Sequence, residues 1–288
     1  MRYIRSMAVA VVALAIGSPL STAYAAPAVM VTDVRGNAFV VKKEKDPSQK
    51  LALLDYLQPG AELRLDSGAR VAVTFLAKPT EIVLNGPATA KIGDGVVNLL
   101  SGLAPRSRKL DAQIASAPGK FSASARERIT VATFEMKSGA MPKLRLLTPS
   151  DTKVLETLPK FMWTVPPGTA ESKFTLVADD GKSVHQARTS GTTLTLPKGV
   201  ALIPGGTYAW KVEAGSAYAD GKFSVADSAT AKRLSKARPG KGSEFSARVL
   251  YAALLDGEGF GHDAMAIWHS LARERPDDTT LARLASWR

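Results

Sequence analysis

The chain has 288 residues, of which 45% are hydrophobic and 22% are charged. This composition excludes a wholly disordered chain, a collagen repeat and a protein with many membrane spans, and the length suffices for two or three domains. Lysine and arginine total 38 against 26 acidic residues, and the net charge of +12 favours anionic partners. Because the chain has no cysteine, disulfides, thiolate metal sites and cysteine nucleophiles are excluded.

The N-terminus has the pattern of a secretory signal peptide. Arg2 and Arg5 precede an uncharged apolar run from Met7 to Ile16, and small residues occupy positions 23 and 25. Export signals combine a basic region, about 7 to 15 apolar residues and a small-residue cleavage site, whereas a spanning helix needs about 20 apolar residues. We therefore expect residues 1–25 to be cleaved, leaving a periplasmic protein without an integral membrane segment. Secretion beyond the periplasm stays open.

An exported protein does not meet cytoplasmic DNA, so no nucleic-acid partner is expected. The remaining anionic partners are envelope glycolipids, acidic glycans and acidic faces of other proteins. A dense run of cations provides the candidate contact for such a partner, and it consists of Arg106, Arg108 and Lys109. The alternative interpretation is a solvated surface, because no block of five or more like charges occurs.

Residues 28–135 are predicted to form an all-β domain. Apolar and polar residues alternate over 62–65 and 70–75, glycine turns separate the alternating segments, and no helical periodicity occurs. We expect the core of this domain to be built by one face of each strand.

Three sequence stretches within this region carry a resemblance to a known family. They are Leu57-Gln-Pro-Gly-Ala-Glu-Leu63, Ser67-Gly-Ala-Arg-Val-Ala-Val-Thr-Phe75 and Ile82-Val-Leu84. Together they resemble the periplasmic FecR-type domain, although Lys78-Pro79-Thr80 stands where an Asp-Gly-Ser turn is usual. The family includes transmembrane regulators that bind sigma factors through a cytoplasmic end. Only the expected signal peptide precedes the domain here, so we do not expect that regulatory role.

Residues 141–225 resemble an immunoglobulin-like or fibronectin type III sandwich. Phe161 and Trp163 lie on an early alternating strand, and Asp179-Asp-Gly181 is typical of a hairpin turn. Leu202 with Tyr208 resembles the tyrosine corner of such sandwiches, which implies a structural tyrosine.

After Asp227 the apolar period changes to about 3.6 residues, which indicates helices. We expect a basic linker or short helix over 226–242 and a helical tail over 243–288, with Ser243 as the first N-cap. The tail resembles one tetratricopeptide-type unit. About three units normally share a core, so this tail must dock on its own β domains or on a partner. The candidate docking residues are Phe245, Val249, Ile267, Trp268 and Leu271.

The sequence contains no recognisable catalytic or metal-binding pattern. Its histidines are His185, His262 and His269, and the last two lie about 10 Å apart along a helix, too far to share one metal ion. No Gly-x-Ser-x-Gly elbow occurs, and Asp179-Asp180 fits a turn. We therefore expect no catalytic residues, no cofactor and no metal.

These observations predict a mainly β protein with a small C-terminal helical hairpin. Its expected function is a non-catalytic interaction or scaffolding role in the bacterial cell envelope, with an envelope protein as partner. One alternative is a module that binds the cell wall or a polysaccharide, which requires exposed Trp163 and Trp210 as stacking platforms. A second alternative is a hydrolase with an unrecognised carboxylate site, which requires two carboxylates in one cleft.

Overall fold

The computed structural model describes residues 29–41, 48–121, 144–240 and 242–286. Strands dominate, so the prediction of a mainly β protein is confirmed. The expected signal peptide, residues 1–25, lies outside the described residues. Within the described ranges, no helix is both long enough and apolar enough to span a membrane.

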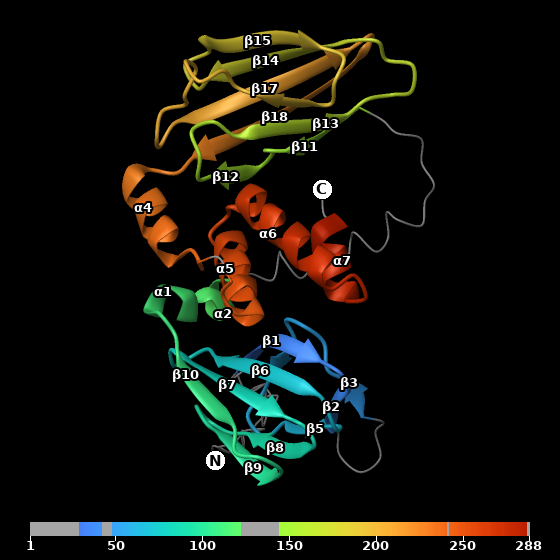
Figure 1. Ribbon diagram of the computed structural model, residues 1–288. Coiled ribbons are helices and arrows are strands. Elements are labelled where there is room, and N and C mark those ends of the chain that lie inside the picture. The colour runs from blue at the N-terminus through green and yellow to red at the C-terminus, as the bar shows by residue number, and fades with distance from the viewer. Residues whose placement is uncertain (1–28, 42–47, 122–143, 241, 287–288) are drawn as a thin grey trace, which may run out of the picture.

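The first β module consists of two five-stranded antiparallel sheets that share one core (Figure 1). One sheet contains β1 (Val29–Arg35), β4 (Tyr56–Leu57), β6 (Arg70–Phe75), β7 (Thr80–Asn85) and β10 (Arg106–Lys109), in the order β10-β7-β6-β1-β4. The other contains β2 (Ala38–Val41), β3 (Gln49–Lys50), β5 (Glu62–Leu65), β8 (Ala88–Ile92) and β9 (Val97–Ser101), in the order β3-β2-β5-β8-β9. Strands β9 and β10 therefore lie at the edges of the two sheets.

Strand β6 shows how the alternating sequence builds this module. Val71 and Val73 point into the core between the sheets, whereas Thr74 on the opposite face is also fully buried. On the neighbouring strand β1, Val31 faces the shared core and Met30 packs into a second core with helices. One face of each of these strands thus builds the core, as predicted, and the second face is buried as well, on β1 against the helices.

Two short helices, α1 (Ala112–Ala115) and α2 (Ala117–Lys120), follow β10. The prediction of a purely β region over 28–135 is wrong at this point. Asp111 caps α1 by accepting a hydrogen bond from the Gln113 N–H, 2.9 Å from Oδ1. Helices of four residues are too short to show a helical period, which is why the sequence pattern missed them.

The second β module is a sandwich of a three-stranded and a five-stranded sheet. The smaller sheet contains β11 (Arg145–Thr148), β13 (Lys160–Thr164) and β16 (Thr193–Thr195). The larger contains β12 (Thr152–Val154), β14 (Ser172–Ala178), β15 (Ser183–Thr189), β17 (Thr207–Ala214) and β18 (Ala217–Val225). Trp163 and Trp210 are each 1% exposed in its aromatic core. The Tyr208 hydroxyl accepts a hydrogen bond from the Ile203 N–H at 2.8 Å, which confirms a structural tyrosine.

The helical layer comprises α1, α2, α4 (Ser228–Ala237), α5 (Phe245–Gly257), α6 (Gly261–Glu274) and α7 (Thr279–Ser286). It lies between the two β modules (Figure 1). Helix α4 confirms the short-helix alternative for 226–242. Helix α5 is buried along most of its length, and its end approaches α2 so closely that a Cβ on Gly257 would lie 2.1 Å from the Lys120 carbonyl oxygen. The predicted cap at Ser243 is wrong, because Glu244 occupies the N-cap position.

The layer joins the sandwich at the start of α6. The Lys153 N–H donates to the Gly259 carbonyl at 2.8 Å, and the Leu155 N–H donates to Asp263 Oδ2 at 2.9 Å. Thr148 Oγ1 lies 2.5 Å from His262 Nδ1. Burial lowers the pKa of His262 to about 4 and raises the pKa of Asp263 to about 6. Both side chains are therefore uncharged in this junction between about pH 4 and 6.

Candidate functional site

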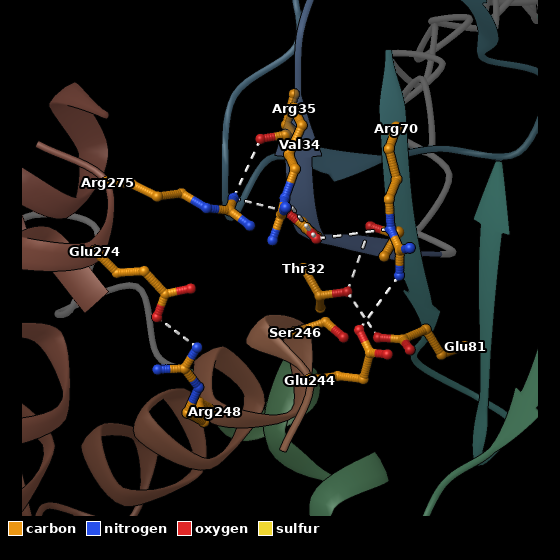
Figure 2. Close-up of polar contacts among 12 residues, drawn as sticks. Thr32, Val34, Arg35, Arg70, Glu81, Glu244, Ser246, Arg248, Glu274 and Arg275 are labelled. Atoms are coloured by element: carbon orange, nitrogen blue, oxygen red, sulfur yellow. Dashed lines mark hydrogen bonds and ion pairs between the residues drawn. The ribbon is translucent and has the colours of Figure 1, made fainter. Parts of the chain in front are cut away.

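The helical layer contacts the first β module through charged side chains that surround a buried carboxylate. Asp33, on β1, is 2% exposed, and Arg275 at the end of α6 places Nη1 2.6 Å from its Oδ1. The same guanidinium donates to the Val34 carbonyl at 3.2 Å (Figure 2). It also lies over the Phe245 ring. Arg275 thereby connects the end of α6, the start of α5 and the first sheet.

Two further arginines approach Asp33 at longer distances. The Nε atoms of Arg35 and Arg70 lie 3.9 and 4.0 Å from Asp33 Oδ2. Arg70 also donates a hydrogen bond at 3.3 Å to Glu244, the residue that precedes α5 (Figure 2). Three guanidinium groups therefore meet two carboxylates, so this cluster carries excess positive charge.

A second buried carboxylate belongs to Glu81 on β7. Arg108 on β10 contacts its Oε2 at 2.6 Å, and Thr32 Oγ1 donates to its Oε1 at 3.2 Å. Arg108 also donates to the Ser246 hydroxyl on α5 at 3.3 Å. The ion pair joins β10 to β7, and the bond to Ser246 joins β10 to α5. Arg108 is therefore engaged in contacts within the chain while 38% of its side chain is exposed, and its role as a contact for an anionic partner stays a prediction.

The other two predicted anionic contacts lie on the surface. Arg106 and Lys109 are exposed on β10, an edge strand of the first sheet. They stay candidates for contact with an anionic group.

The predicted partner-docking residues are mostly inside the molecule. Phe245, Val249, Trp268 and Leu271 are each 3% exposed or less, and Ile267 is partly buried against the same core. This core also contains Met30 of the first module, so the helices bury their apolar faces within their own chain. Docking of these five residues on a separate partner is therefore corrected to packing within the chain.

Exposed apolar side chains gather instead at β9 and its two ends. Val96, Leu100 and Leu103 are 48%, 58% and 71% exposed. The β8–β9 register shifts at Leu100, because Thr89 pairs with Ser101 and Ala90 pairs with Leu99. The sequence missed this surface, because alternation within a strand does not reveal which strand lies at the edge of a sheet.

A crevice of about 780 Å³ opens between the first module and the helical layer. Three acidic residues line it: Glu274, Asp277 and Asp278. Glu274 pairs with Arg248 at 2.5 Å, and Asp278 accepts hydrogen bonds from two N–H groups of α7, so both carboxylates already hold the structure together.

The remaining candidates from the sequence occupy structural positions. Trp163 and Trp210 are buried, so neither presents a ring face to a sugar. His262 lies in the sandwich junction, whereas His269 is exposed. The described part of the chain contains no group of three potential His, Cys, Asp or Glu metal ligands.

No family model and no curated protein matches the chain. The likeness of its modules to FecR-type, immunoglobulin-like and tetratricopeptide-type units therefore stays a prediction from the sequence.

Proposed function

We propose that this protein is a non-catalytic interaction or scaffolding protein of the bacterial cell envelope, exported to the periplasm. The observation that supports this proposal most strongly is the concentration of exposed apolar side chains at β9, namely Val96, Leu100 and Leu103. Exposed apolar patches on soluble proteins commonly mark sites of protein contact.

The position of this patch favours an extended protein segment as its occupant. Strand β9 is the edge of its sheet among the described strands, and an edge strand presents backbone N–H and C=O groups to an added strand. The next strand, β10, carries the exposed cations Arg106 and Lys109. An extended segment with apolar residues and acidic neighbours would complement both features.

A second copy of the chain fits this surface less well. A second copy would present the same exposed cations of β10 at this surface and would supply no acidic complement. Like charges at an interface disfavour association. The proposed partner is therefore an envelope protein with an acidic, extended segment.

The scaffolding part of the proposal rests on the helical layer. One apolar core contains Met30 of the first module, Leu234 of α4 and Trp268 of α6. The layer also hydrogen-bonds to the sandwich through Gly259 and Asp263. These contacts support two β modules held in one fixed arrangement, as a scaffold requires.

The test is cross-linked capture from native envelope, comparing the parent with the double variant Leu100→Asp/Leu103→Asp. The matched control is Ile203→Asp, because Ile203 is 71% exposed on the sandwich. We expect the parent and the control to capture the same acidic partner and the double variant to lose it. Equal capture by all three proteins would contradict the proposed surface.

A further inference from the structure

The crevice between the first module and the helical layer has walls of different charge. One wall is formed by the turn after β1 and by residues 50–53, and the other by residues 274–280 at the α6–α7 connection. Its volume of about 780 Å³ is typical of small-ligand sites, which often lie between structural units. The first wall contains Arg35 and Lys50, whereas the second contains the three acidic residues described above.

Several of these charges already have partners within the protein. Glu274 pairs with Arg248, and Asp278 caps α7. Arg275 is held by Asp33, by the Val34 carbonyl and by the Phe245 ring. These groups shape the crevice and are committed to the fold.

The groups left to meet a ligand are two cations and one carboxylate. The Arg35 side chain is 57% exposed, and its 3.9 Å contact with Asp33 is longer than a hydrogen bond. Lys50 and Asp277 are exposed on opposite walls. Leu51 and Leu53 lie at the base of the crevice and are buried in the two apolar cores.

We propose that this crevice binds an amino acid or short peptide that carries two carboxylates and one amine. Arg35 would hold one carboxylate through its forked N–H groups, and Lys50 would hold the second. Asp277 would accept hydrogen bonds from the ammonium group. This ligand matches the two cations and one carboxylate that the walls present. The site is separate from the β9 surface and does not depend on it.

The direct test is titration calorimetry on the full chain with the dipeptide Ala-Glu as the probe. Ala-Gln lacks the second carboxylate, and N-acetyl-Glu lacks the amine. We expect Ala-Glu to bind with one-to-one stoichiometry and both comparison compounds to bind about tenfold more weakly, because each loses one charge-assisted contact. Absence of Ala-Glu binding at millimolar concentration would overturn the proposal. Binding of inorganic phosphate as tight as that of Ala-Glu would also overturn it, since it would indicate a general anion site.

Single substitutions test which residues of the crevice contact Ala-Glu. Arg35→Ala should weaken Ala-Glu binding about tenfold, and Asp277→Asn should abolish the preference for Ala-Glu over N-acetyl-Glu. The control is Arg106→Ala, which removes an exposed cation of β10 outside the crevice. All three positions are exposed or intermediate at the surface, so melting temperatures should match the parent. An equal loss of binding in Arg106→Ala would show that overall charge, and not the crevice, holds the probe.

Discussion

The two faces of the helical layer use different chemistry to hold the two β modules. Toward the first module, the buried carboxylates Asp33 and Glu81 are each paired with an arginine at 2.6 Å. Toward the sandwich, the Thr148 hydroxyl contacts the His262 ring and the Leu155 N–H donates to Asp263, and burial keeps both side chains uncharged between about pH 4 and 6. We call the side of the layer toward the first module the charged face and the side toward the sandwich the neutral face. The stability of the charged face should depend on its arginine partners, and the stability of the neutral face should depend on pH.

Removal of residues 243–288 should have the largest effect. These residues cover Met30, Leu53 and Leu54, which are each 6% exposed or less in the shared core. The truncated chain should lose cooperative unfolding of the first module and become poorly soluble, because a large apolar surface becomes exposed. Circular dichroism melts and sedimentation would measure this. A truncated protein whose first module still melts cooperatively would show that the helices are only an accessory docking element.

Removal of Arg275 tests the charged face. Arg275→Met should lower the free energy of unfolding by about 3 kcal/mol or more, because it leaves the buried Asp33 carboxylate without its close partner. Arg273→Met is the matched control, since Arg273 is exposed on the same helix. Urea denaturation of both variants measures the difference. Equal stability of the two variants would mean that Arg275 contributes nothing beyond a surface arginine.

The neutral face predicts opposite pH responses for two single variants. Asp263 has a raised pKa, so its contribution to stability is complete below its ordinary value of 3.8 and is lost as pH rises through about 6. His262 has a lowered pKa, so its contribution is complete above 6.5 and is lost as pH falls through about 4. In the parent these trends cancel between about pH 4 and 6, because folding releases one proton from His262 and takes up one on Asp263.

In each single variant, the free energy of unfolding should show only the pH dependence of the residue that remains. Asp263→Asn should become more stable as pH rises from about 4 to 6, by roughly 1.4 kcal/mol per pH unit, whereas His262→Gln should become less stable over the same range. The double variant should regain a flat profile. Urea denaturation at half-unit pH steps measures these slopes. Parallel profiles for the two single variants would show that the junction is not neutral in this range.

The exposed cations of β10 should have the smallest effect on stability. Arg106→Ala with Lys109→Ala should change the free energy of unfolding by less than about 0.5 kcal/mol, since both side chains are exposed. Arg108→Ala on the same strand is the comparison. It should lower the free energy of unfolding clearly more, because it leaves the buried Glu81 carboxylate without its arginine partner. A similar loss of unfolding free energy in both variants would contradict a structural difference between Arg108 and the two exposed cations.

The sequence predicted the positions of strands and helices better than it predicted what packs against them. Alternation located β6, and the 3.6-residue period after Asp227 located the helical tail that contains α6. Periodicity reports which residues are apolar, but not what covers them. It therefore could not show that Phe245 and Trp268 pack within the chain, or that Met30 faces helices while Val31 faces the sheet core.

The candidate sites were harder to predict because they depend on long-range contacts. Arg108 and Glu81 are 27 positions apart, and Arg275 is 242 positions from Asp33. No local spacing encodes such pairs. Arg106, Arg108 and Lys109 form one run in the sequence, yet Arg108 is committed to Glu81 and the other two remain exposed.

The central claim is that the helical layer holds the two β modules in one arrangement. Because the chain has no cysteine, spin labels can be placed on the single pair Asn98→Cys on β9 and Gln186→Cys on β15, both exposed positions. Pulsed electron resonance should give one narrow distance distribution between these labels, and Arg275→Met should broaden it. A broad distribution in the parent protein would contradict a fixed arrangement of the modules.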